Sequence, residues 1–377
     1  MSQNTARLLL ALSFVLGGAA CAKDTPGNPT EPTLDRSRDQ GSVEADDRED
    51  RDDDRDDDDR PFTLALIGDA PYGQQKRDSF PALISLINAD PQVERVIHIG
   101  DIKAGKNTLC TDAYFADIKA QFDTFQDPLV YTPGDNEWTD CHAGKKNGSY
   151  TPTERLQAVR ALFFATPGRT LGINSRKVRT QANDPANAQY VENVLWSRKG
   201  VTFATLNITG SNNDKNPWGA LPADAGNYPS QATEQITRAQ ANAAWLARTF
   251  ALAGRRHAKA VVIGFQADMW DPAETIATLD GYDALVQQLG TLAAQFGKPV
   301  LLIMGDSHKF NVDNPYSAGA AVARSLHATS YPIAENVTRL VVEGSDKGRT
   351  EYTRLTIDPK SSTPFTFVRV PLDPNAP

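Results

Sequence analysis

The chain has 377 residues, with 39 lysines and arginines against 47 aspartates and glutamates, so its formal net charge is −8. This acidic balance argues against the basic footprint by which proteins bind nucleic-acid backbones. The excess is local: residues 22–60 hold 16 acidic and 7 basic side chains, and the chain from residue 61 onward is close to neutral. Those remaining residues are enough for one large core.

Residues 1–20 are predicted to be a signal peptide of lipoprotein type. Arg7 precedes an apolar stretch at residues 8–15 that is too short to span a bilayer permanently, and small residues follow at 17–20. Cys21 comes directly after them, which resembles a bacterial lipoprotein signal, although Gly18 stands where that signal usually has Leu. We therefore expect export to the periplasm or cell envelope. A lipid on Cys21 would anchor the protein in a membrane, the outer membrane if the cell is Gram-negative.

Residues 21–60 are predicted to be a disordered acidic linker. The segment ends in a run of aspartates interrupted by arginines, and it has too few apolar side chains to bury a core. The run would collect Ca²⁺ only loosely, because it lacks the Gly and the terminal Glu of a folded calcium loop. We expect a solvated spacer that holds the folded domain, residues 61–377, away from a membrane.

The folded domain begins with strands and helices in alternation. A strand at residues 64–67, a helix at 80–89, a strand at 96–99, a helix at 114–125 and a strand at 129–132 predict a β-α-β-α-β unit. Further helices are expected at 153–164, 233–252 and 282–296, and an irregular excursion at 168–191. Strands are expected at 194–196 and 201–208 as a pair in a second sheet, at 260–265 and 298–304, and as an antiparallel group at 339–342, 351–357 and 365–370. Two sheets flanked by helices, an α/β class, is the implied architecture.

Four Gly-Asp pairs each end a short apolar run. They end at Asp69, Asp101, Asp135 and Asp306, and a fifth apolar run, at residues 261–265, leads into Gln266. Such runs suit buried strands, and the carboxyl edge of an open α/β sheet is where ligands bind. Carboxylates gathered there would repel one another without a cation. The alternative is that each Asp only caps the following helix.

The order of these motifs resembles that of the calcineurin-like metallophosphoesterases, whose strands end in D-x-H, G-D, G-N-H-(D/E), a lone His and G-H-x-H. The resemblance spans about residues 63–310. It implies a two-sheet αββα sandwich and the hydrolysis of a phosphate mono- or diester by metal-activated water. Individual motifs depart from the family pattern, and several of its histidines are replaced here.

The resemblance carries six metal ligands over to this sequence, position by position. Asp69 matches the first ligand and Asp101 the carboxylate that bridges two metals, while the remaining positions of the set are filled by Asp135, Gln266, Asp306 and His308. Pro71 replaces the first histidine and cannot ligate. Oxygen ligands favour Mn²⁺, Mg²⁺, Ca²⁺ or Fe over Zn²⁺. We expect one or two divalent ions, the more secure pocket being that of Asp101, Asp135, Gln266 and Asp306.

Two residues are candidates for a catalytic role. Asn136 stands where the family has a histidine that assists the leaving group, and an amide can bind phosphate but cannot donate a proton as an acid. His142 lies six residues further on and is the candidate for catalysis or for support of the site. The alternative for His142 is an exposed loop histidine, and His98, inside a strand, is expected to be a satisfied core residue.

Three residues are candidates for substrate binding: Tyr72, Lys103 and Asn212. Tyr72 would reach the site through its phenol oxygen, or would stack on substrate or pack. Lys103, like Lys309, would neutralise phosphate or simply be solvated. Asn212 would contact substrate from a loop, or belong to an ordinary turn.

The cysteine count fits one disulfide. With Cys21 assigned to lipid, Cys110 and Cys141 remain, and in an exported protein such a pair is most simply a bridge. It would tie the loop after Asp101 to the loop after Asp135. Two unpaired thiols are the alternative.

Together these patterns predict an exported, metal-dependent phosphoric ester hydrolase that acts on a small-molecule phosphate ester. The rival hypothesis is a catalytically impaired cell-surface protein that binds metal or phosphate ligands. The replaced histidines and Asn136 motivate the rival.

Overall fold

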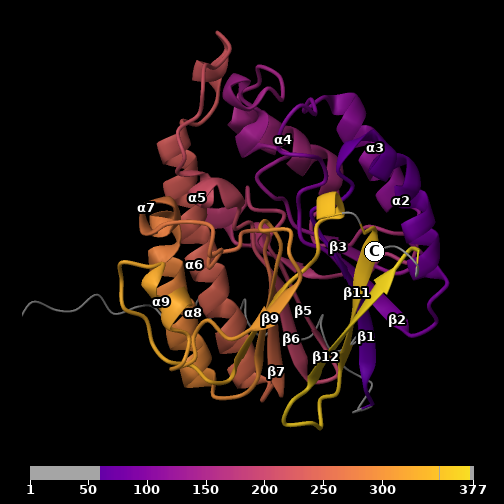
Figure 1. Ribbon diagram of the computed structural model, residues 1–377, viewed down its shortest axis with the longest axis vertical. Helices are drawn as coiled ribbons and strands as arrows, with labels where there is room; N and C mark the ends of the chain where they lie inside the picture. Colours follow the sequence, from indigo (N-terminus) through magenta and orange to yellow (C-terminus); the bar gives the residue numbers. More distant parts are fainter. Residues whose placement is uncertain (1–59, 348, 374–377) are drawn as a thin grey trace, which may run out of the picture. The chain divides into compact units, whose positions relative to one another are not determined.

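The computed structural model describes residues 60–347 and 349–373 (Figure 1). The predicted signal peptide, Cys21 and all of the predicted linker except its last residue lie outside the described residues. The described chain folds into two β-sheets with helices packed against them. This is a mixed α/β architecture, as the sequence predicts.

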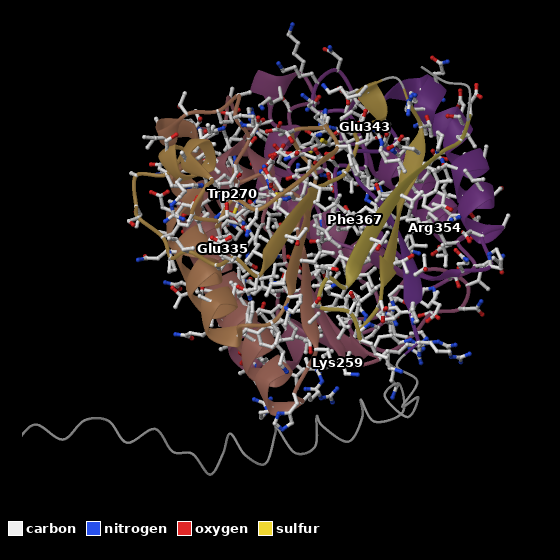
Figure 2. The ribbon with its side chains drawn as sticks, turned by 60° about the horizontal axis from the view of Figure 1, so that its bottom comes forward. Lys259, Trp270, Glu335, Glu343, Arg354 and Phe367 are labelled. Atoms are coloured by element: carbon white, nitrogen blue, oxygen red, sulfur yellow. A yellow bond between two sulfur atoms is a disulfide. The ribbon has the colours of Figure 1, made fainter. Side chains whose placement is uncertain are left out.

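The first sheet has five strands in the order β12-β11-β1-β2-β3. Strands β1 (Phe62–Ile67), β2 (Val93–His98) and β3 (Leu129–Tyr131) run parallel, and helices α2 (Gly73–Asn88) and α3 (Asp112–Phe122) connect them. The predicted β-α-β-α-β unit is confirmed. Strand β11 (Glu351–Ile357) pairs antiparallel with β1, and β12 (Phe365–Pro371) pairs antiparallel with β11. Phe367 packs against the core between the sheets (Figure 2).

The second sheet has seven strands in the order β4-β5-β6-β7-β8-β10-β9. Strands β5 (Val194–Arg198) and β6 (Val201–Thr205) form the predicted pair, which is antiparallel. Strands β6, β7 (Ala260–Gly264), β8 (Val300–Met304) and β10 (Val337–Val341) are parallel. Short edge strands complete it, β4 (Arg179–Thr180) and β9 (Asn311–Asp313). Helices α6 (Gln231–Arg255) and α8 (Asp283–Phe296) cover one face.

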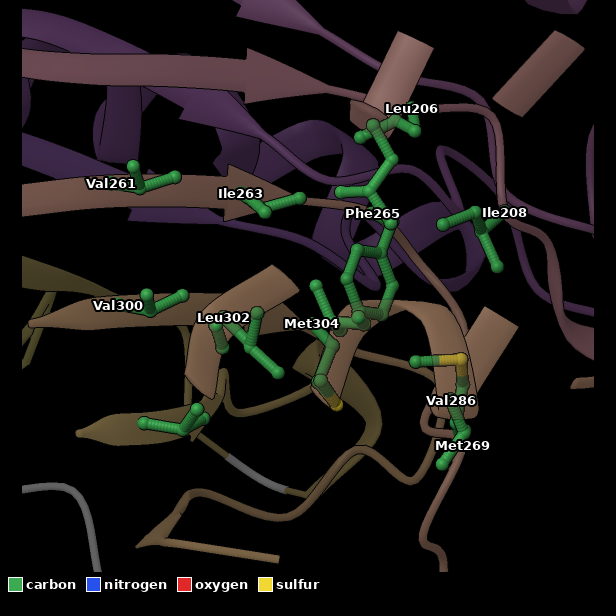
Figure 3. Close-up of a cluster of buried hydrophobic side chains, with 14 of the residues drawn as sticks. Leu206, Ile208, Val261, Ile263, Phe265, Met269, Val286, Val300, Leu302 and Met304 are labelled. Carbon is green, nitrogen blue, oxygen red and sulfur yellow. The ribbon is translucent and has the colours of Figure 1, made fainter. Parts of the chain in front are cut away.

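Side chains that alternate along each strand divide the core into three layers. Leu64 and Leu66 of β1 pack between the two sheets with Leu301 and Ile303 of β8. The intervening residues of β1 face helices α2, α3 and α4 (Pro152–Phe163). The intervening residues of β8 face α6 and α8 (Figure 3). Two sheets buried on both faces therefore form a sandwich between outer helices, because a strand with period-two burial needs a layer on each side.

The prediction of an antiparallel group at the end of the chain is wrong for one strand. Strand β10 pairs in parallel with β8, Val337 opposite Val300, and belongs to the second sheet. A short apolar run carries no mark of strand direction, so alternation alone could not identify its partner. The sequence also missed β9 and three short helical segments: α5 (Gly210–Asp214), α7 (Ile276–Leu279) and α9 (Ala321–Ser325).

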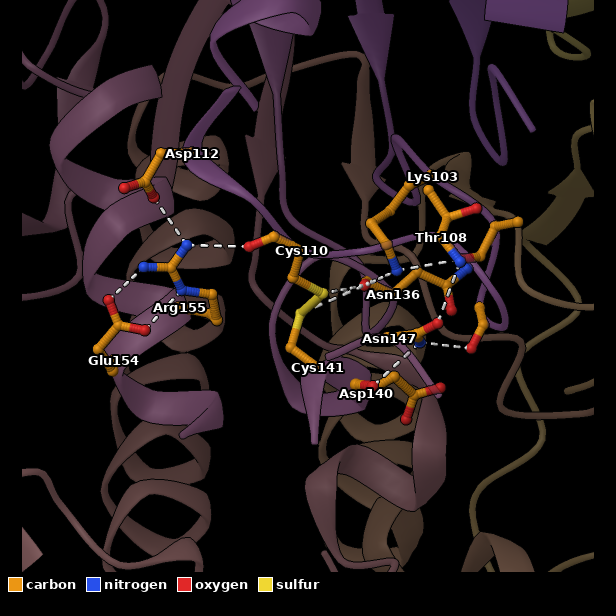
Figure 4. Close-up of a disulfide and its surroundings, with 12 residues drawn as sticks. Lys103, Thr108, Cys110, Asp112, Asn136, Asp140, Cys141, Asn147, Glu154 and Arg155 are labelled. Carbon is orange, nitrogen blue, oxygen red and sulfur yellow. Dashed lines mark hydrogen bonds and ion pairs between the residues drawn. A yellow bond between two sulfur atoms is a disulfide. The ribbon is translucent and has the colours of Figure 1, made fainter. Parts of the chain in front are cut away.

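The predicted disulfide is confirmed between Cys110 and Cys141, whose Cα atoms lie 5.8 Å apart (Figure 4). Both cysteines are buried, and the bridge joins the loop after β2 to the loop after β3. Arg155 of α4 donates to the Cys110 carbonyl at 2.9 Å and to Asp112 at 2.7 Å, which attaches this junction to the helical layer. A disulfide is typical of proteins that mature in an oxidising compartment.

Within the described ranges, none of the helices has the length and apolar character needed to cross a bilayer.

Removing the bridge tests its contribution to stability. The bridge closes a loop of 31 residues in sequence separation, so the loop-entropy model predicts that a double Cys110→Ser, Cys141→Ser variant loses about 3–4 kcal/mol of unfolding free energy. Replacing both cysteines avoids leaving a reactive thiol. Urea unfolding of variant and parent gives the difference. A loss below about 1 kcal/mol would mean that the core alone fixes these loops.

Candidate metal centre

Four carboxylates from four strand ends meet at one place. Asp69 follows β1, Asp101 follows β2, Asp135 follows β3 and Asp306 follows β8, so the loops come from both sheets. The first three are buried and Asp306 is partly exposed. The site therefore lies where the carboxyl edges of the two sheets face each other, as expected for an α/β fold.

The carboxylates fall into two groups that share one member. Asp69, Asp101 and His308 each offer a ligand atom within 4.8 Å of the other two, and the same holds for Asp101, Asp135 and Asp306. Asp101 belongs to both groups. The five residues of the two groups are among the six that the sequence nominates as ligands.

The backbone at these positions is turned into an uncommon conformation. The φ angles are +49° at Asp69, +59° at Asp101, +66° at Asp306 and +60° at His308. Left-handed backbone costs roughly 1–2 kcal/mol per non-glycine residue and clusters at functional sites. Gly134 allows the loops to meet, because a Cβ there would lie 2.1 Å from Asp101 Oδ1.

Burial makes these carboxylates costly to ionise without a cation. Loss of solvent raises the pKa of Asp69 to about 6, against the opposing effect of His308, and that of Asp135 to about 7, with Asp140 adding to the rise. The pKa values of Asp101 and Asp306 lie well above the ordinary range, from burial first and then from Asp135. A bound cation would offset both the cost of burying these charges and the repulsion between them.

Two side chains, those of Tyr72 and Asn136, hydrogen-bond Asp101. Tyr72 donates its phenol proton to Asp101 Oδ2 at 2.8 Å, and the same phenol oxygen lies 3.3 Å from His308 Nε2. Asn136 donates to Asp101 Oδ2 at 2.6 Å and to Tyr72 Oη at 2.8 Å. The phenol oxygen thus lies beside two members of the group of Asp69, Asp101 and His308.

His308 is oriented for ligation by a carboxylate outside the group. Its Nδ1 lies 3.0 Å from Asp346 Oδ1, and its Nε2 lies 3.6 Å from Asp69 Oδ1. A carboxylate that accepts from one ring nitrogen leaves the other free to bind a metal. Asp346 is a member of the site that the sequence analysis did not find.

Gln266 lies beside the group of Asp101, Asp135 and Asp306, with its amide nitrogen toward Asp135. Its Oε1 accepts from Gly210 N at 2.6 Å, and its Nε2 donates to Asp135 Oδ1 at 3.4 Å. In this orientation Gln266 positions Asp135. Ligation through Oε1 requires the amide to turn over and give up the bond from Gly210.

A series of hydrogen-bonded polar side chains extends from Asp135, and the sequence analysis did not predict it. Ser211 Oγ lies 2.9 Å from Asp135 Oδ2 and 2.9 Å from Asp140 Oδ1. Lys145 Nζ pairs with Asp140 Oδ2 at 2.9 Å, and the Lys145 side chain is 33% exposed. A solvent-accessible cation is therefore connected to the buried acids through a hydroxyl and a second carboxylate.

Ser211 reaches the site from an unusual turn. Residues 211–214 all have positive φ, from +52° to +63°, so the segment labelled α5 contains a left-handed turn. Buried Arg238 holds this turn by donating to Asn213 Oδ1 at 2.6 Å and to Asn213 O at 3.0 Å. Asn and Asp tolerate this backbone better than other side chains, which explains the Asn-Asn-Asp sequence here.

The structure does not bring the Asn212 side chain to the carboxylates. Asn212 donates to Asp280 Oδ1 at 2.8 Å and accepts from Gly281 N at 2.8 Å, so both ends of the amide bind a neighbouring loop. Its neighbour Ser211, and not Asn212, hydrogen-bonds a carboxylate of the site. Adjacent residues in a turn face different ways, and the sequence carries no sign of which one does.

Lys103 lies beneath the site and not at its surface. Its Nζ donates to Asn136 O at 2.8 Å and to Ala104 O at 3.0 Å, and burial lowers its pKa to about 8. Glu137 belongs to the third strand-end motif but is not nominated as a site residue from the sequence. It also binds groups of the surrounding loops. Its Oε1 accepts from Asp101 N at 3.2 Å, Gly134 N at 2.8 Å and Tyr131 Oη at 2.7 Å. Both side chains fix the loops that carry Asp101 and Asp135.

His142 and His98, both discussed in the sequence analysis, are held by main-chain groups. His142 Nδ1 accepts from Gly144 N at 3.1 Å and Gly219 N at 2.9 Å, so its proton is on Nε2, and burial lowers its pKa. Neither of these bonds reaches a cluster carboxylate. His98 is fully buried, bonded to Ala70 O at 2.9 Å and to Gly100 N at 3.2 Å, and the prediction of a satisfied core residue is confirmed.

The two groups could hold a metal ion. Carboxylates dominate both groups, and Asp346 directs the one imidazole.

No protein-family model and no curated protein matches this chain. Among solved structures, one similar chain is described as "GAP50 the anchor in the inner membrane complex of Plasmodium". The two are 8% identical with a TM-score of 0.44, over 83% of this chain and 89% of that chain. A likeness this distant says nothing about the function of this chain. A functional proposal therefore rests on the geometry of the site.

Metal affinity should depend on pH in a definite direction. Asp135, with a pKa of about 7, and Asp69, with a pKa of about 6, hold protons in the metal-free protein at mildly acidic pH, and a cation must displace them. Mn²⁺ affinity should therefore fall about tenfold or more between about pH 8 and about pH 6, with proton release on binding. Calorimetric titration in buffers of different ionisation enthalpy measures both quantities. Affinity independent of pH would contradict the assignment of these carboxylates as ligands.

Proposed function

We propose that this protein is a metal-dependent phosphoric ester hydrolase of the calcineurin-like type. The observation that carries the proposal is that Asp101 is shared by two groups of possible ligands. One carboxylate between two cation pockets suits a site that holds two ions side by side, and such sites are characteristic of phosphoryl transfer. The order of the strand-end motifs, independent of this geometry, supports the same class.

The residues of this chain would divide the work between the two pockets. Asp69 and His308 would hold one ion, Asp135 and Asp306 the other, and Asp101 both. Bound there, a divalent ion supplies positive charge for the phosphate oxygens and a water of lowered pKa. In the overall reaction water adds to phosphorus, the bond from phosphorus to the alcohol oxygen breaks, and the products are an alcohol and a phosphate with one fewer ester bond.

Other side chains would bind and orient the ester. The Asn136 amide and the Tyr72 phenol lie against Asp101 and would hydrogen-bond phosphate oxygens. The leaving oxygen needs a proton that Asn136 cannot give. His142 carries a proton on Nε2, and we propose that this N–H hydrogen-bonds the leaving oxygen while solvent water supplies the proton.

The rival function is a binding protein without turnover. Two observations favour it: an amide occupies the place of the family's catalytic histidine, and none of the His142 hydrogen bonds reaches the carboxylates. Such a protein would bind metal and phosphate through the same residues. Hydrolysis of aryl phosphate mono- and diesters by the Mn²⁺-loaded protein separates the two, since bound metal with no turnover of either ester supports the binder.

The proposed location is outside the cytosol. The Cys110–Cys141 disulfide supports an oxidising compartment. Attachment to a membrane through a lipid on Cys21 stays a prediction, and intact mass spectrometry of the membrane-extracted protein tests it. A mass without an added lipid would refute the anchor and leave the hydrolase proposal untouched.

Substitution of the shared carboxylate tests the proposed site. Asp101→Asn should abolish Mn²⁺-dependent hydrolysis, because it removes the charge common to both pockets. The same change relieves repulsion among buried acids, so melting in EDTA should occur at the parental temperature or higher. Activity and thermal melting with and without Mn²⁺ measure both effects.

Asp224→Asn, a change of the same charge at an exposed position, serves as the matched control. It should leave activity and metal-dependent melting unchanged. Hydrolysis by Asp101→Asn at the parental rate would refute the site.

A further inference from the structure

A cavity outside the two ligand groups is lined by residues that adjoin those groups in the chain. It has a volume of about 590 Å³ and is lined in part by Ser307 and Lys309, the neighbours of Asp306 and His308 in the chain. Lys347 also lines it and follows Asp346, the residue that binds His308 Nδ1. A pocket of this volume is within the range of small-molecule sites.

The interior of this pocket is largely apolar. Trp270, Phe310, Val322 and Leu326 line it. Val322, on the short helix α9, is 68% exposed. The pocket therefore offers an apolar wall that an organic group could cover.

The buried charges of the pocket, Asp268 and Arg339, are paired with each other. Arg339 donates to Asp268 at 2.7 Å and to Asp313 at 2.6 Å, and Ser307 donates to Asp268 at 2.7 Å. A ligand part that enters this region consequently meets no uncompensated buried charge. Lys309 is exposed and pairs with no other residue of the described chain, whereas Lys347 pairs with Asp346 at 3.3 Å.

We infer that this pocket binds the alcohol part of the substrate, and that the substrate is a phosphate ester of an apolar alcohol. This inference rests on the proposed function and specifies its substrate class. The phosphate would occupy the carboxylate site through its cations, with Lys309 at the border between the two parts. The apolar group, an alkyl chain or an aromatic ring, would lie along Val322, Leu326 and Phe310. A small polyol phosphate would leave this wall exposed.

Binding of phosphonates to the full-length, Mn²⁺-loaded protein tests the inference without turnover. Methylphosphonate and hexylphosphonate share a headgroup, and neither has an ester bond to hydrolyse. Hexylphosphonate should bind at least about tenfold more tightly, because its added methylenes leave water. Phenylphosphonate, titrated in parallel, shows whether a ring or a chain gains more.

Val322→Asp places a charge on the apolar wall at an exposed position. It should cut the preference for hexylphosphonate to about twofold or less while methylphosphonate affinity is kept. Val368→Asp, the same substitution at a valine that is 48% exposed on β12 and does not line the pocket, is the matched control and should keep the full preference.

The outcomes separate the inference from the proposed function. Equal affinity for the methyl, hexyl and phenyl compounds, or a preference that survives Val322→Asp, would overturn the apolar subsite. A preference lost in Val322→Asp but kept in Val368→Asp upholds it. The same pattern in a protein that hydrolyses no phosphate ester would uphold the pocket and overturn the hydrolase.

Discussion

The structure depends on one unfavourable arrangement: like charges buried together at the meeting edge of two sheets. Asp69, Asp101 and Asp135 are nearly inaccessible to water, and Asp306 adjoins them. Buried carboxylates without a partner either take up protons or need a cation, and loss of solvent is the largest cause of each raised pKa here. A chain that keeps four such groups within reach of one another gains by binding a metal.

The rest of the fold can be understood as the support for this arrangement. The sandwich brings β1, β2 and β3 of one sheet to the same edge as β8 of the other. The disulfide and Glu137 lock the loops after β2 and β3, and the left-handed turn held by Arg238 delivers Ser211 to Asp135. Glu137, Arg238 and both cysteines are buried, so these supports lie within the folded interior.

The sequence predicted the parts of the site that lie at strand ends and missed those that depend on loop geometry. Asp101 and Asp306 were found because an apolar run and a glycine precede each of them. Ser211, Asp140 and Asp346 carry no such mark, since their contacts arise from turns whose course is set by tertiary bonds. Likewise the α/β class followed from periodicity, whereas the position of β10 next to β8 did not, because a short buried strand does not encode its neighbour.

The central claim is that these carboxylates hold a common cation. Anomalous diffraction from crystals of the protein grown with Mn²⁺ tests it most directly. We predict an anomalous peak within about 2.0–2.6 Å of oxygens from Asp101, Asp135 and Asp306. A crystal with these residues well ordered and no Mn²⁺ peak among them, or a peak only at other surface acids, would contradict the account.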